Sequence, residues 1–182
     1  MLREGEGNQN CVRVASARKL ARKLLRSAKI DSPPVLIKRL VPFLEKEHEL
    51  VIRPWLLSDH VSGFLLEEDG CAAIAYNKNH HIHRQRFTVA HEIGHLILGH
   101  NNRNKGRDRE LDEKEAQIFA TELLMPLEFL KVDLRSDGCD LERLARRYWV
   151  SSEAMSWRIQ DKVVKCPEFG GQRILLVRYS VL

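Results

Sequence analysis

The run from Thr88 to His100 constrains the fold most, because it places two histidines and a glutamate in an otherwise apolar helix. It reads Thr-Val-Ala-His-Glu-Ile-Gly-His-Leu-Ile-Leu-Gly-His, so that His91, Glu92 and His95 form an H-E-x-x-H arrangement. The neighbouring residues are apolar almost all round the helix, which predicts that it is buried. Buried polar side chains need partners, and the fold must therefore bring further polar groups or an ion to this helix.

The spacing of the two histidines predicts a metal site. Residues four apart lie on one face of a helix, about one turn apart, so the imidazoles of His91 and His95 can hold a single ion. Glu92 lies about 100° round the helix from His91, close enough to reach a water molecule on the ion without replacing it. Zinc lowers the pKa of such a water toward about 7, and a neighbouring carboxylate can take its proton as a carbonyl carbon is attacked. The motif thus predicts Zn²⁺ as cofactor, Glu92 as catalytic general base, and peptide-bond hydrolysis.

A catalytic zinc ion needs a third protein ligand and an open coordination position. Candidates lie in a second helical pattern that ends at Pro126. Its predicted apolar stripe consists of Ala116, Phe119, Ala120, Leu123 and Leu124. Glu113 lies at the margin of this stripe and is the predicted third ligand, although Asp112 also flanks it and helical projection does not exclude Asp112. Glu115 and Glu122 point to the opposite face, and Glu115 is expected to be an ordinary solvated carboxylate.

Two of these segments resemble the ImmA/IrrE-type metallopeptidases. The resemblance lies in Arg-Phe-Thr-Val-Ala-His-Glu-Ile-Gly-His, which ends at His95, and in Glu-x-x-Ala-x-x-Phe-Ala-x-x-Leu-Leu-Met-Pro, which begins at Glu113. It extends over most of the chain, including residues 61–66 and 144–155. It implies a gluzincin-like site with Glu113 as a ligand, and action on helix-turn-helix repressors encoded nearby. Gln117 departs from the pattern, since Asn or Asp is commoner there, and it is expected to support a ligand rather than to be one.

Composition and patterning predict an α+β fold, a mostly helical zincin-like domain with a small antiparallel sheet and a helix-turn-helix-like C-terminal segment. The chain has 182 residues, of which 43% are hydrophobic and 30% charged, which fits a compact domain. We expect residues 1–133 to form the metallopeptidase core, including the N-terminal helices and a hairpin, and residues 134–182 to form the helix-turn-helix-like segment and a tail packed on the core.

The sequence also carries expectations about location and cysteine chemistry. No apolar run reaches about 18 residues, and the N-terminus lacks the apolar centre of a signal peptide, so we expect a cytoplasmic protein that does not span a membrane. The four cysteines, Cys11, Cys71, Cys139 and Cys166, are scattered without a C-x-x-C pair. In such a protein they are expected to be thiols rather than disulfides.

The first helical segment concentrates much of the net charge of +5. Its basic residues are Arg13, Arg18, Lys19, Arg22, Lys23, Arg26 and Lys29. We expect them to form a solvated face opposite a buried apolar side, with attraction of acidic partners or polyanions as the alternative. The prolines after Asp31 should end this helix, and a second helix is predicted over about residues 35–46.

Apolar runs at residues 50–53, 63–66 and 71–76 predict strands, and Asp69-Gly70 predicts a hairpin turn between the last two. Residues 72–76 are our candidate for an edge strand that pairs with an extended substrate, although the same run can equally be a central strand. His80, His81 and His83 are expected to lie in a polar loop. A donor to the oxyanion of the reaction is expected from Tyr76 or from one of these histidines.

Residues 141–163 resemble a helix-turn-helix, with Ser151 predicted to cap the second helix. Basic residues that suit DNA are Arg143, Arg146, Arg147, Arg158 and Lys162. Trp149 speaks against this use, because it occupies a turn position where glycine is common and a bulky residue is costly at positive φ. A helical platform that recognises a protein is therefore preferred over a DNA-binding one.

Two classes of function follow. The first is a zinc-dependent endopeptidase whose ligands are His91, His95 and Glu113, and the family resemblance adds a helix-turn-helix repressor as its substrate, in mobile-element or stress control. The second is a DNA-binding regulator, or a non-catalytic protein-binding partner, with an idle or structural zinc site. Glu92 separates the two, because a structural ion needs no carboxylate beside an open coordination position. The oligomeric state stays open.

Overall fold

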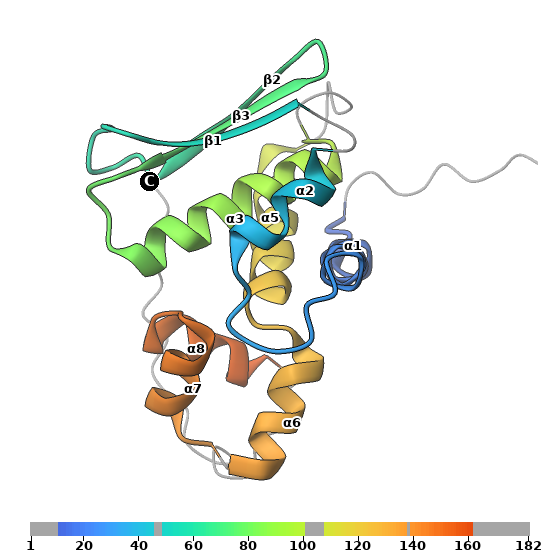
Figure 1. The fold of residues 1–182 in the computed structure, drawn as a ribbon, viewed down its shortest axis with the longest axis vertical. Coiled ribbons are helices and arrows are strands. Elements are labelled where there is room, and N and C mark those ends of the chain that lie inside the picture. Colours follow the sequence, from blue (N-terminus) through green and yellow to red (C-terminus); the bar gives the residue numbers. More distant parts are fainter. Residues whose placement is uncertain (1–10, 46–48, 101–107, 138, 162–182) are drawn as a thin grey trace, which may run out of the picture.

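The computed structural model describes residues 11–45, 49–100, 108–137 and 139–161. A three-stranded sheet lies across one side of helix α3 (Ile82–Leu98), and helix α5 (Arg109–Leu124) packs against another side of α3 (Figure 1). Helix α1 (Val14–Ser27) packs beside α5, and the helices that follow α5 gather at the end of the molecule away from the sheet. This arrangement confirms the predicted α+β class.

The other helices in the described part of the chain are shorter. They are the 3-10 helix η1 (Ile37–Arg39), α2 (Val41–Leu44), α6 (Leu127–Asp137), α7 (Leu141–Tyr148) and α8 (Ser152–Gln160). The single helix expected over residues 35–46 is therefore wrong within the described residues, because two short elements take its place. Pro42 explains the break: it lacks a backbone N–H, so it fits only in the first turn of a helix, and α2 begins there.

The sheet is mixed. Strands β2 (Gly63–Glu68) and β3 (Cys71–Asn77) form the predicted hairpin, with Asp69 at φ 46° and Gly70 at φ 84° in the turn. Strand β1 (Glu49–Trp55) pairs in parallel with β3, so the expectation of a purely antiparallel sheet is wrong. Strands β1 and β2 run in opposite directions and are not neighbours in the sheet. Strand β3 lies between them, parallel to β1 and antiparallel to β2. The edge strand that we predicted at residues 72–76 is therefore central, and β2 is an edge of the described sheet.

Helix α5 is covered from two sides, by α3 and by α1. The predicted apolar stripe is buried, and Gly94 lets α3 approach closely, because a Cβ there would lie 3.1 Å from Cδ1 of Phe119. Glu115 and Glu122 are buried as well, so the prediction of a solvated Glu115 is wrong. Their carboxylates face α1, whose Arg13 and Arg22 lie 2.7 Å from Glu115 and Glu122, respectively. Part of the basic surface of the first helix therefore neutralises buried acids.

Helices α7 and α8 form the predicted helical pair, and the hydroxyl of Ser151 caps α8 by accepting the N–H of Ala154 at 3.1 Å. Trp149 ends α7 at φ 54°, so the bulky residue does adopt the positive φ that we expected it to avoid. Arg86 supports this turn, because its buried guanidinium donates to the carbonyls of Tyr148, Trp149 and Val35 and lies 5.5 Å from the Trp149 ring centroid.

Other expectations meet mixed outcomes. Cys11 and Cys71 are exposed thiols as expected, but Cys139 is disulfide-bonded, so the expectation of thiols is wrong there. Cys166 and the tail from residue 162 lie outside the described residues, and the division of the chain at residue 133 stays a prediction. None of the helices that the structure describes is long and apolar enough to span a membrane.

Candidate metal centre

Helices α3 and α5 bring together the three predicted ligand side chains. Nε2 of His95 lies 3.0 Å from Nε2 of His91, which in turn lies 3.1 Å from Oε2 of Glu113. Oε1 of Glu113 lies 3.7 Å from Nε2 of His95. The first two side chains are one turn apart on α3, and the third reaches them from the first turns of α5, so the close packing of these two helices creates the cluster.

The donor set fits a zinc ion. Zn–N and Zn–O distances are near 2.0–2.1 Å, so the ligand atoms of a tetrahedral site lie about 3.3 Å apart, which is close to the three separations between His91, His95 and Glu113. Two imidazole nitrogens and one carboxylate oxygen are also the donor types of catalytic zinc sites, which leave one position open. Two imidazole lone pairs that face each other at 3.0 Å repel unless a proton or a cation lies between them. The cluster is thus suited to a divalent cation.

Glu92 and strand β2 line the cavity in front of this cluster. The cavity has a volume of about 530 Å³, and its walls include Gly63, Phe64 and Leu65 of the edge strand together with Glu92 and Arg109. Gly63 is required where β2 meets α3, because a Cβ at this position would lie 2.5 Å from Cγ2 of Thr88. The edge strand β2 and the cluster thus border the same cavity.

The surroundings of the site shift the pKa values of two glutamates, Glu113 and Glu92. Hydrogen bonds with His91, and then with His95, hold the pKa of Glu113 well below its usual range, although burial acts in the opposite sense. Burial is the largest influence on Glu92 and raises the pKa of its carboxyl group, while the two imidazoles act to lower it. The surroundings of Glu113 thus favour its charged form, whereas those of Glu92 favour its neutral form.

A second row of side chains, made of His100, Asp112 and Glu115, contacts Nδ1 of His95 through His100. Nδ1 of His100 lies 2.9 Å from Nδ1 of His95, and Nε2 of His100 lies 3.2 Å from Oε2 of Glu115. Gly99 makes this contact possible, because it ends α3 at φ 69° and turns the chain so that His100 returns toward the helix. If Nε2 of His95 binds an ion, its Nδ1 carries the proton and donates to His100, which then donates to Glu115.

The second row has the donor types of a metal site, since His100, Asp112 and Glu115 lie close together and are buried. The guanidinium of Arg13 already donates two hydrogen bonds to Oε2 of Glu115, from its Nε at 3.0 Å and from its Nη2 at 2.7 Å. A positive charge in this place competes with a cation, so the arrangement suits support of His95 better than a second ion. Sequence reasoning missed this row, although a histidine directly after the glycine that ends a metal helix is a usable signal.

The other candidate residues are not part of the cluster of His91, His95 and Glu113. Asp112, the alternative ligand, groups with His100 and not with the His91–His95 pair, whereas Glu113 contacts both imidazoles. His80 contacts the carbonyl of Asp59 at 3.1 Å, and neither Tyr76 nor any histidine of the 80–83 cluster is among the described residues that line the site cavity. The oxyanion donor that we expected from this group is therefore not brought to the cluster.

The two remaining histidines of that group lie at the start of α3, where His81 caps the helix by accepting the N–H of His83 at 3.3 Å. Gln117, the expected ligand support, lines a different cavity, one turn along α5.

Known proteins give two points of comparison. The model of a peptidase family, described as the IrrE N-terminal-like domain, matches residues 47–160. Among solved structures, a Mycobacterium tuberculosis transcriptional regulator is similar with a TM-score of 0.59 at 14% identity, over 80% of this chain and 46% of that chain. The chain thus spans about half the length of that regulator, and the likeness is one of fold. No curated protein sequence matches the chain significantly.

Proposed function

The chain belongs to the peptidase family of the IrrE N-terminal-like domain, and from this premise we propose that it is a zinc-dependent endopeptidase. The observation that carries the proposal is the convergence of His91, His95 and Glu113, with ligand-to-ligand separations of 3.0 to 3.7 Å. Glu92 stands beside them in the cavity of about 530 Å³ that β2 borders, and we take this cavity to be the entry path of a polypeptide. A structural ion would need neither this carboxylate nor this access.

The side chains divide the work of hydrolysis. His91, His95 and Glu113 hold the ion, which when bound supplies Lewis-acid chemistry that lowers the pKa of a water molecule and polarises a carbonyl group. Glu92 accepts a proton from the attacking water and later donates it to the leaving amine. The second row, through His100, keeps the ring of His95 in the tautomer that presents Nε2 to the site.

The substrate is a polypeptide that adds to the edge of β2 on which the described residues place no further strand. Strand addition uses main-chain hydrogen bonds, so it gives affinity with little sequence demand. Three residues of β2 line the site cavity, which is the support for this placement. As the family resemblance implies, we propose a helix-turn-helix repressor encoded nearby as the target.

The competing function, DNA binding by α7 and α8, has less support. Arg158 is buried and lies 2.5 Å from Glu122, and Arg147 lies 2.8 Å from Asp133. The guanidinium of Arg158 is held inside the protein and is therefore poorly available to phosphates, whereas the side chain of Arg147 is paired but 46% exposed. Lys162 lies outside the described residues.

The proposal is tested by cleavage of the helix-turn-helix repressor encoded beside this gene. Wild type and the Glu92→Gln variant are compared at equal, measured zinc content, with Glu110→Gln as a control because Glu110 lies exposed on α5. We expect wild type and the control to cut the repressor, and Glu92→Gln to bind zinc while losing more than 99% of the rate, in line with the roughly 10²–10⁴-fold contribution of a general base. Equal cleavage by Glu92→Gln would refute its role, and an intact repressor with every zinc-loaded protein would refute this target.

A further inference from the structure

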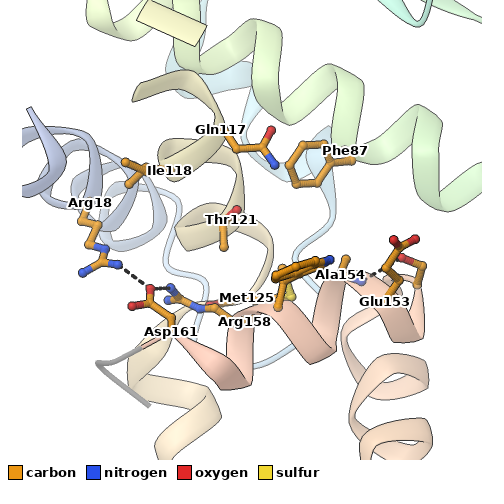
Figure 2. A pocket seen from close by; sticks show the side chains of 12 residues that line it. Arg18, Phe87, Gln117, Ile118, Thr121, Met125, Glu153, Ala154, Arg158 and Asp161 are labelled. Atoms are coloured by element: carbon orange, nitrogen blue, oxygen red, sulfur yellow. Dashed lines mark hydrogen bonds and ion pairs between the residues drawn. The ribbon is translucent and has the colours of Figure 1, made fainter. Parts of the chain in front are cut away.

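We propose that a second cavity, one helical turn beyond the candidate metal centre, binds apolar side chains of the substrate about two to five residues from the scissile bond. This inference rests on the proposed function and deepens it. The cavity has a volume of about 660 Å³ and lies where α1, α3, α5 and α8 meet (Figure 2). No part of the chemistry described above uses it.

The position of the cavity follows from the two helices that carry the metal centre. Phe87 precedes His91 by one turn of α3, and Gln117 follows Glu113 by one turn of α5, and both line the cavity. Thr121 and Met125 continue its wall two and three turns beyond Glu113. With a rise of 1.5 Å per residue, the cavity thus begins about 6 Å from the candidate ligands and extends to about 18 Å.

The chemistry of the walls selects uncharged, apolar groups. Apolar side chains from three helices line much of the cavity, namely Phe87, Ile118, Met125, Ala154 and Trp157. Three of the charged residues at its border pair with each other, since Asp161 lies 2.5 Å from Arg18 and 3.5 Å from Arg158, as the dashed lines in Figure 2 show; Glu153, also at the border, is exposed. Arg158 also lies 2.5 Å from Glu122. A charged ligand would have to break these pairs, whereas an apolar one would not.

Size and spacing identify the occupant as a short stretch of polypeptide. A cavity of about 660 Å³ lies within the range of about 300–1,000 Å³ that is usual for ligand sites, and it has room for more than one side chain. An extended chain advances about 3.3 Å per residue, so a substrate anchored at the metal centre reaches the cavity about two to five residues from the scissile bond. Trp157, which is 45% exposed, offers its ring to such side chains, and Gln117 and Thr121 offer hydrogen bonds to their main chain.

The binding step is tested without any turnover, in the zinc-loaded Glu92→Gln protein. The probe is a capped tetrapeptide of leucine and phenylalanine, compared with a capped tetrapeptide of serine and aspartate, and the readout is the NMR shift of the Trp157 indole N–H, assigned with Trp157→Phe. We expect the apolar peptide alone to move this signal and to leave that of Trp55, on the sheet, unchanged. Binding of both peptides, or of neither, would overturn the proposal.

Filling the cavity supplies the second measurement. Ala154→Phe and Thr121→Phe add a ring from opposite walls, and we expect each to weaken the apolar peptide at least tenfold. Ala73→Phe makes the same change on an exposed position of β3 and should bind the peptide like wild type. Equal affinity in all variants would overturn the proposal, as would a chain that self-associates with Trp157 buried between two copies.

Cleavage profiles separate this inference from the proposed function. On a library of natural peptides, the wild type should prefer large apolar residues two to five positions from the cut, and Ala154→Phe should lose this preference at unchanged zinc content. If the peptide binds at Trp157 but nothing is cut, the peptidase proposal fails while the cavity remains a peptide site. If cleavage proceeds without any such preference in the wild type, the peptidase stands and the cavity proposal fails.

Discussion

His100 shows how one buried side chain can set the chemistry of another. Its imidazole lies between Nδ1 of His95 and the carboxylate of Glu115, which Arg13 neutralises. Partners of this kind fix the tautomer and orientation of a ligand histidine, and their loss typically lowers metal affinity about 10–100-fold.

We therefore expect His100→Ala to bind zinc about 10–100 times more weakly than wild type. His100→Asn should recover part of the affinity, because its amide can accept from His95 and donate to Glu115. His60→Ala, on an exposed histidine, is the control and should bind zinc normally. Competition with a chromophoric chelator measures the three affinities, and an unchanged value for His100→Ala would show that the contact is not needed.

For single residues, the sequence predicted contacts within one helix better than contacts between segments that are far apart in the chain. His91, Glu92 and His95 are fixed relative to each other by helix geometry, whereas the apolar stripe left both Asp112 and Glu113 open and the family resemblance favoured Glu113. The burial of Glu115 could not be predicted in this way, because its partner Arg13 stands 102 residues earlier in the chain. A helical projection assumes one buried face, and a carboxylate that is paired on a second face violates that assumption.

Among the elements, α5 stands out because it contacts α1, α3 and α8. Its two covered faces carry different chemistry: apolar contacts with α3, and ion pairs with α1 and α8. Glu122 joins three helices, since its carboxylate lies 2.7 Å from Arg22 of α1 and 2.5 Å from Arg158 of α8. Removal of one partner of a buried pair leaves an uncompensated charge, which typically costs about 3–5 kcal/mol.

Glu122→Ala should accordingly lower the free energy of unfolding by about 3–5 kcal/mol, because it leaves the buried guanidinium of Arg158 without this carboxylate. Glu110→Ala removes an exposed ion pair with Lys114 on the same helix and should cost less than about 1 kcal/mol. Urea unfolding followed by circular dichroism measures both. Equal losses in the two variants would mean that the buried pairs contribute no more than surface ones.

Element prediction succeeded where the signal was local. The hairpin followed from Asp69-Gly70, and the helical pair followed from the spacing of its buried residues and from Ser151. The parallel pairing of β1 with β3 has no such signal, because alternation along a strand says which face is buried and not which neighbour it takes. The position of Trp149 at positive φ depends on Arg86, 63 residues away, which contacts its carbonyl.

For the whole molecule, the metal centre couples ligand binding to folding, because its donors come from two helices that separate when the chain unfolds. A ligand that binds only the folded state stabilises it by about 2.7 kcal/mol at a free concentration 100 times its Kd. We expect zinc to raise the thermal unfolding temperature of wild type, and EDTA to reverse the effect. Glu113→Ala should lose most of this shift and His60→Ala should keep it. A shift of equal size in Glu113→Ala would place the bound zinc elsewhere.

The pairing of α1 with α5 bears on how this domain can be isolated. The family match begins at residue 47, whereas Arg13 and Arg22, which neutralise Glu115 and Glu122, precede it. A fragment cut to residues 47–160 would discard these two guanidiniums and would also remove α1, which covers this face of α5. The segment that matches the family model is therefore shorter than the segment that packs together, and a fragment meant to keep both buried ion pairs has to start before Arg13.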